Sequence, residues 1–176
     1  FGDPSGGESI LSEEVCLPPV LADAPVVTHV TVDETSEDMG VVTVSWKPPF
    51  DIDVADFGID YRYEVQRGVG LIPSNYTSLG ITADTTFTDT GLDTDGEAYG
   101  YRIVLYSNDA TLVGPTDPID TSSVASSVRL EPRPLFEQIE LYWTAVVPWS
   151  NNSQDYPWHY IYRKNEGEPD DQYILI

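Results

Sequence analysis

The sequence predicts an all-β, antiparallel sandwich followed by a truncated second copy of the same fold. Seven short segments between residues 25 and 130 alternate apolar with polar side chains, as a strand with one buried face does. Gly, Pro, Asp and Asn lie between these segments, and no stretch has the pattern and capping residues of a long amphipathic helix. This arrangement favours a sandwich over a fold of alternating strands and helices.

The first two predicted strands supply one side of the core. Residues 26–32 contain four valines among polar side chains, and in residues 41–46 the side chains of Val42, Val44 and Trp46 fall on one face. We expect these three residues in the core, because only one face of each strand meets the opposite sheet. Pro48 ends the second strand, since proline has no amide hydrogen to donate to a neighbouring strand.

Five further strands complete the predicted sandwich. In the longest of them, Tyr99, Tyr101, Ile103 and Leu105 recur at spacing two, so Tyr99 and Ile103 are also expected in the core. These five strands are predicted at residues 61–67, 76–79, 85–88, 98–106 and 123–130.

The segment from residue 124 repeats the beginning of the first unit. Its Trp143 lies 97 positions after Trp46, and the triplet 161–163 repeats the triplet 65–67. By this correspondence we expect a second set of core residues, and a further strand at residues 172–176. The expected core residues of the second unit are Ile139, Leu141, Trp143 and Ile161.

The repeat predicts three parts in the chain. Residues 1–24 are an acidic linker or the end of an upstream domain, 25–123 form the sandwich, and 124–176 form the first half of a second one. Half a sandwich leaves one side of Trp143 exposed and strand edges unpaired. We therefore expect that the polypeptide continues or that a partner covers this face. Cys16, in the linker, is either a lone thiol or half of a disulfide to an upstream domain.

Composition excludes several classes of function. The 176 residues include 30 acidic and 8 basic ones, which gives a formal charge of −22. Such a charge disfavours nucleic acid and anionic lipid, since both are bound largely through Lys and Arg. No run of about 20 apolar residues is available to insert into a membrane. Composition gives weak support to a location outside the cytoplasm.

The residues that carry the strand pattern resemble a fibronectin type III module, which has an immunoglobulin-like sandwich fold. The resemblance lies in Val42-x-Val44-x-Trp46-x-x-Pro49, in Tyr61-Arg62-Tyr63, and in Leu92 ahead of Tyr99-x-Tyr101-x-Ile103. It implies that Trp46 fills the core. It also implies that the Tyr99 hydroxyl ties the crossover between two strands to the backbone.

A narrower resemblance concerns residues 123–130, 141–151 and 161–163. These segments are similar to paired modules that precede the C-terminal signal of gliding-motility-associated surface proteins in Bacteroidota, which are type IX secretion cargo. The resemblance implies a non-catalytic spacer and adhesive segment of a large exported cell-surface protein. Its implied partners are other domains of the same polypeptide, secretion-machinery or surface proteins, and glycans. The alternative is an accessory module of a secreted polysaccharide-degrading enzyme.

Two groups of acidic residues are candidates for a catalytic site or a calcium site. Glycosidases need two carboxyl groups facing one cleft, and calcium needs six to eight oxygen ligands. Acids in the loops of a small sandwich are more often solvated turns. We therefore expect no catalytic residue and no cofactor, with calcium as the alternative. The two groups are Asp51, Asp53 and Asp56, and Asp93, Asp95 and Glu97.

Aromatic residues near the C-terminus form a candidate partner surface. Trp and Tyr rings can stack on sugars or anchor a protein partner. The plainer interpretation is that they pack a loop onto one sheet face. The residues are Trp149, Tyr156, Trp158, Tyr160 and Tyr162.

Overall fold

The computed structural model describes residues 23–108, 117–148, 161–163, 165, 167–169, 172 and 174–176. The predicted linker and Cys16 therefore lie almost wholly outside the described residues. The elements are β1 (Val26–Glu34), β2 (Gly40–Lys47), α1 (Val54–Phe57), β3 (Tyr61–Val69), β4 (Thr77–Thr82), β5 (Thr86–Leu92), β6 (Tyr99–Ser107), β7 (Asp120–Thr121), β8 (Ala125–Ser126), β9 (Arg129–Leu135), β10 (Gln138–Thr144), β11 (Tyr162–Arg163) and β12 (Ile174–Leu175).

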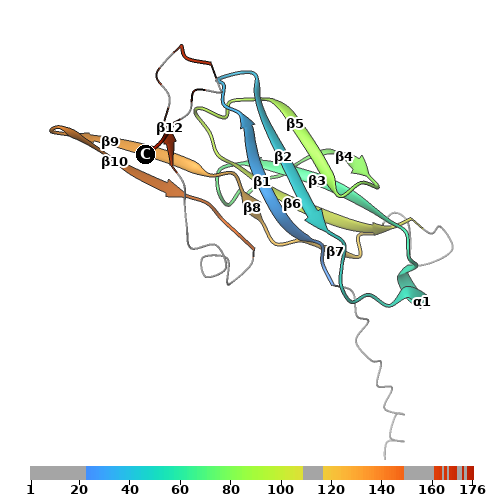
Figure 1. The fold of residues 1–176 in the computed structure, drawn as a ribbon. Helices are drawn as coiled ribbons and strands as arrows, with labels where there is room; N and C mark the ends of the chain where they lie inside the picture. The colour runs from blue at the N-terminus through green and yellow to red at the C-terminus, as the bar shows by residue number, and fades with distance from the viewer. Residues whose placement is uncertain are drawn as a thin grey trace, which may run out of the picture.

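Two antiparallel sheets form the sandwich, and the predicted all-β fold is confirmed (Figure 1). The first sheet has the order β1-β2-β5, and the second has the order β4-β3-β6-β7, with β8 also paired to β6. Every strand pair is antiparallel, and strand β3 matches β6 over nine residue pairs without a shift. These two sheets enclose one hydrophobic core.

Strand β2 shows how alternation in the sequence becomes packing. Val42 and Val44 are completely buried and Trp46 is 3% exposed, whereas the residues between them are half-buried. The Trp46 ring meets Tyr63 of the facing sheet edge-on, with ring centroids 5.6 Å apart. Ile103 of β6 is completely buried in the same core. The core positions expected from the alternation along β2 therefore lie between the two sheets.

The turn from β5 to β6 is held by the tyrosine that the resemblance singled out. The hydroxyl oxygen of Tyr99 accepts a hydrogen bond of 3.1 Å from the backbone N–H of Asp93. The ring itself is buried in the core at 6% exposure. One side chain thereby joins the core to the crossover between the two sheets.

The strand predicted at residues 123–130 is divided in the structure. Its first part, β8, pairs with β6 and buries Ala125 in the first core. The backbone N–H of Ser127 donates to the Tyr99 carbonyl oxygen at 2.9 Å. The first sandwich therefore continues to Ser127, past the predicted boundary at residue 124. The reason is that two short strands, β7 and β8, share the edge of β6.

The chain then forms a hairpin, β9–β10, that projects from the sandwich (Figure 1). The prediction that Ile139 and Trp143 are core residues is wrong for this structure, since they are 66% and 44% exposed. Leu141 and Ile161 are half-buried. The physical reason is that Trp46 is covered by a facing sheet, whereas no such sheet covers Trp143 among the described residues. The truncated second copy itself stays a prediction.

The predicted strand at residues 172–176 is shorter in the structure. Its described part, β12, pairs with β11 through Tyr162 with Leu175 and Arg163 with Ile174. The backbone N–H of Ile176 also donates to the Ile161 carbonyl oxygen at 2.9 Å.

Helix is nearly absent from the described part of the chain. Its one helix, α1, is a single turn of four residues in the loop between β2 and β3. In this part of the molecule, therefore, no helix has the length and hydrophobicity needed to cross a bilayer.

We expect that Trp46→Ala destabilises the sandwich by about 3–5 kcal/mol, because the substitution empties a large core site. The matched control is Trp143→Ala on the exposed hairpin, which should cost no more than about 1 kcal/mol. Urea denaturation followed by circular dichroism measures both changes. Equal losses in the two variants would show that the hairpin tryptophan is as well packed as the core tryptophan.

Candidate functional site

The first acidic group surrounds helix α1. The Asp53 carboxylate accepts a hydrogen bond of 2.9 Å from the backbone N–H of Ala55 and so caps the helix. Asp56 lies in the first turn of that helix, where a negative charge is favourable. Asp51 contributes its backbone carbonyl, which accepts from the N–H of Asp23 at 2.9 Å. These residues therefore have local structural roles.

The second acidic group closes the turn between β5 and β6. The Asp93 carboxylate accepts from the backbone N–H of Gly96 at 2.6 Å, and the Glu97 N–H donates to the Asp93 carbonyl at 3.1 Å. The Asp95 carbonyl accepts from the Arg129 guanidinium at 2.6 Å. Throughout the described ranges, no three His, Cys, Asp or Glu side chains gather as ligands of a metal ion would.

Three grooves on the described surface could hold a ligand. Each is lined by only one acidic residue, namely Asp95, Glu137 or Asp60. A glycosidase needs two carboxyl groups about 5–10 Å apart across one cleft. These grooves therefore lack the pair of carboxyl groups that this reaction needs.

The predicted aromatic surface falls mainly outside the described residues. Of its five members only Tyr162 is described, on β11, where it is 55% exposed. The other four, Trp149, Tyr156, Trp158 and Tyr160, lie in the segment 149–160. A partner surface at these residues stays a prediction.

The main polar cluster of the core was missed by our reading of the sequence. Both carboxylate oxygens of Asp89, on β5, accept from the Arg67 guanidinium of β3, at 2.9 and 3.0 Å. The Tyr101 hydroxyl of β6 donates to the same carboxylate at 3.0 Å. The Arg67 guanidinium also lies 5.5 Å from the centre of the Tyr99 ring. This cross-sheet cluster therefore links the two sheets by charge as well as by packing.

Burial and charge increase the proton affinity of Tyr101 in this cluster. Burial raises the pKa of the Tyr101 hydroxyl far above its usual value, and the neighbouring Asp89 carboxylate raises it further. A signal for the cluster was present in the sequence. Strand alternation places Asp89 on the same face as Phe87, and Arg67 on the same face as Tyr63 and Val65. A carboxylate at an inward position requires a positive partner.

The outer face of β3 and β6 carries a second polar arrangement. The Arg102 guanidinium lies 4.0 Å from the centre of the Tyr76 ring and donates to the Gln66 side-chain oxygen at 2.7 Å. The Tyr106 hydroxyl donates to Glu64 at 3.1 Å, and burial together with this bond raises the Tyr106 pKa. These groups bind one another, so the face is already internally paired.

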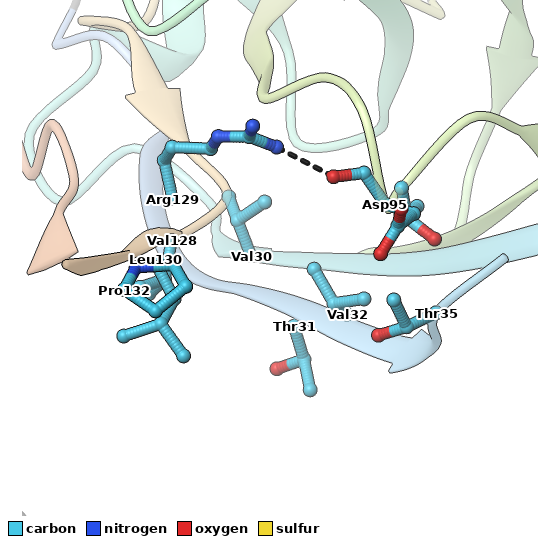
Figure 2. Close-up of a pocket in the computed structure, with 10 residues that line it drawn as sticks. Val30, Thr31, Val32, Thr35, Asp95, Val128, Arg129, Leu130 and Pro132 are labelled. Carbon is cyan, nitrogen blue, oxygen red and sulfur yellow. Dashed lines mark hydrogen bonds between the residues drawn. The ribbon is translucent and has the colours of Figure 1, made fainter. Parts of the chain in front are cut away.

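A groove of about 710 Å³ runs along the junction between the sandwich and the hairpin. Figure 2 shows Arg129 reaching across it to the Asp95 carbonyl, while Leu130 and Pro132 lie together on the hairpin side. Its lining is mainly apolar and comes from β1, the β5–β6 turn and the start of β9. The lining residues are Val30, Thr31, Val32, Thr35, Thr94, Asp95, Val128, Arg129, Leu130 and Pro132.

Comparisons with known proteins found similarity among solved structures. No protein-family profile matches the chain, and no curated protein sequence matches it significantly. Among solved structures, the chain is similar to one described as the solution structure of the fourth FNIII domain of human. The two are 17% identical with a TM-score of 0.45, over 70% of this chain and 89% of that one. The described residues themselves show the antiparallel β-sandwich that the sequence predicts.

Removal of the Asp89 carboxylate should destabilise the sandwich by about 3 kcal/mol, because Asp89→Ala leaves the Arg67 charge without its partner between the sheets. The double variant Arg67→Met with Asp89→Leu should recover at least half of this loss, since no unpaired charge remains. Urea denaturation measures both values. If the double variant is as unstable as the single one, the loss of stability comes from altered packing and not from the unpaired charge of Arg67.

Stability should also fall at high pH. A raised pKa in the folded state means that Tyr101 keeps its proton while the unfolded chain loses it. Its contribution is thus complete below about pH 10, the ordinary pKa of a tyrosine hydroxyl, and is lost as pH rises further. Tyr101→Phe should reduce the slope of unfolding free energy above pH 10 by up to about 1.4 kcal/mol per pH unit. Urea titrations from pH 9 to 11 measure the slope, and an unchanged slope contradicts this assignment.

Proposed function

We propose that the chain is a non-catalytic structural spacer in a larger extracellular protein. One observation carries this proposal: the chain enters the sandwich at one end and leaves it at the other (Figure 1). At the entry end, Asp23 is bonded to Asp51 in the loop before α1. At the exit end, Arg129 is bonded to Asp95, whose turn is bonded to Ser36 between β1 and β2. This geometry suits modules joined end to end.

The junction with the hairpin supports a stiff connection. The backbone N–H of Ser126 donates to the Val146 carbonyl at 2.9 Å, and the Val146 N–H donates to the Ser126 hydroxyl at 2.8 Å. Arg129 adds the bond to Asp95 on the sandwich. Hydrogen bonds from both sides of the joint limit rotation of the hairpin, as a spacer requires.

The location and the partners belong to the same proposal. Fibronectin type III-like domains are commonly extracellular, and the formal charge of −22 favours a well-solvated surface. The resemblance to modules of gliding-motility-associated proteins supports export by a type IX system and display on the outside of the outer membrane. There the segment acts in adhesion, bearing neighbouring domains and contacting surface proteins, secretion machinery or glycans. It requires no cofactor.

We expect antibodies against the recombinant chain to label intact cells of the source organism, and brief protease treatment of those cells to remove the label. The reason is that a surface spacer is accessible without lysis. Immunofluorescence with and without permeabilisation measures this. An antibody to a cytoplasmic protein, which should label only permeabilised cells, is the control.

Two outcomes would contradict the proposal. Labelling that appears only after permeabilisation would place the protein inside the cell. Strong binding of the recombinant chain to insoluble polysaccharide, combined with hydrolysis of that polysaccharide by the intact protein, would favour the accessory-module alternative.

A further inference from the structure

The turn between β5 and β6 contains Asp95-Gly96, the one Asp-Gly dipeptide in the chain. An aspartate before a glycine can form a cyclic imide, because the glycine nitrogen attacks the side-chain carbonyl carbon of the aspartate. Glycine has no side chain to obstruct this approach. Both residues are exposed, and neither ion pair found within the described ranges involves the Asp95 carboxylate. That carboxyl group is therefore free to turn toward the Gly96 nitrogen.

Two charged groups hold the peptide bond that joins Asp95 to Gly96, one at its nitrogen and one at its oxygen. The Asp93 carboxylate oxygen lies 2.6 Å from the Gly96 nitrogen and accepts its hydrogen. The Arg129 guanidinium donates to the Asp95 carbonyl oxygen, also at 2.6 Å (Figure 2). A carboxylate on the N–H and a cation on the oxygen of one amide both favour loss of the amide proton. This arrangement belongs to the folded chain, since Arg129 lies 34 positions after Asp95.

We propose that Asp95 converts to isoaspartate in the folded protein, through a cyclic imide formed with Gly96. The Gly96 nitrogen gives its proton to the Asp93 carboxylate and bonds to the side-chain carbonyl carbon of Asp95. The Asp95 carboxyl group enters this step in its protonated form. Its hydroxyl then leaves as water, with the proton that Asp93 took up. The inference goes beyond the proposed function, because this chemistry is independent of where the protein is located.

Arg129 also influences how the imide opens. Water can add to either of the two carbonyl carbons of the imide ring. Addition at the side-chain carbon restores aspartate. Addition at the former backbone carbonyl carbon breaks the bond of that carbon to the Gly96 nitrogen, which takes up a proton, and gives isoaspartate. Because the guanidinium stabilises the negative charge that develops on the oxygen of this second carbon, it favours the isoaspartate product.

The product changes the contact between the sandwich and the hairpin. The oxygen that accepts from Arg129 belongs to a neutral amide before the reaction. In isoaspartate the same oxygen belongs to a free carboxylate, because the main chain then runs through the former side chain. A guanidinium attracts a carboxylate more strongly than it attracts a neutral carbonyl, and salt screens that attraction. The conversion therefore places an ion pair at the junction without changing the net charge of the chain.

Incubation of the full chain at neutral pH in heavy-oxygen water tests the proposal. Electron-transfer dissociation mass spectrometry distinguishes isoaspartate from aspartate and locates the incorporated oxygen. The comparison is a synthetic peptide of residues 89–101, which contains the same dipeptide without Arg129. We expect Asp95 to convert about tenfold faster in the folded chain than in the peptide, because only the fold brings both charged groups to the amide.

Variants of the chain separate the two charged groups. Arg129→Met and Asp93→Asn should each slow the conversion about tenfold. The asparagine keeps an oxygen that accepts from Gly96, so the turn is retained while the base is lost. Arg129→Lys keeps a positive charge and should give an intermediate rate. The matched control is Arg133→Met on the same hairpin, which should convert at the rate of the parent, since Arg133 pairs with Glu140 instead.

Three results would overturn the proposal. A rate in the folded chain that is equal to or below the rate in the peptide would show that the fold does not promote the reaction. Conversion at the parent rate in Arg129→Met or in Asp93→Asn, with melting temperatures that show folded variants, would contradict the assigned roles. Incorporation of heavy oxygen into aspartate alone would show that the imide opens at the side-chain carbon and that no isoaspartate forms.

Discussion

The structure depends on the contact between two sheets whose inward faces alternate along each strand. Val42, Val44 and Trp46 supply this face from one sheet, and Tyr63 and Ile103 supply it from the other. Burial of such side chains provides most of the stability of a domain of this size. Each loop, turn and junction described above is positioned because these strands are held in a fixed register. The cross-sheet cluster of Arg67 and Asp89 adds a charged constraint to this packing.

The strand pattern predicted the first unit well. Six of its strands begin or end within a few residues of the expected positions, because a half-buried strand needs alternation and its turns need Gly, Pro, Asp or Asn. The division of residues 123–130 was not predicted, since the apolar pattern there continues across two different sheets. Whether a side chain is covered depends on distant strands. For this reason Trp46 and Trp143 have the same local pattern and different exposure.

The candidate sites show a similar limit. Acidic residues in loops suggested calcium or catalysis, but Asp53 and Asp93 use their carboxylates on neighbouring backbone N–H groups. Such bonds within three residues follow from local chain geometry and were available from the sequence. The pairing of Arg67 with Asp89 joins different sheets and required knowledge of which strands face each other. Neither residue of this pair was predicted from the sequence.

The two ends of the first sandwich differ in how firmly they are held. Strand β1, near the entry of the chain, is joined to β2 by seven residue pairs, whereas β8, near the exit, is joined to β6 by two. If the polypeptide is pulled at both ends, the same force acts on the β1–β2 pairing and on the β8–β6 pairing. The shorter pairing, between β8 and β6, then breaks first, and Ala125 leaves the core while β1 stays in place. The module would lengthen under load by peeling one strand and would return to its folded length when the tension ends.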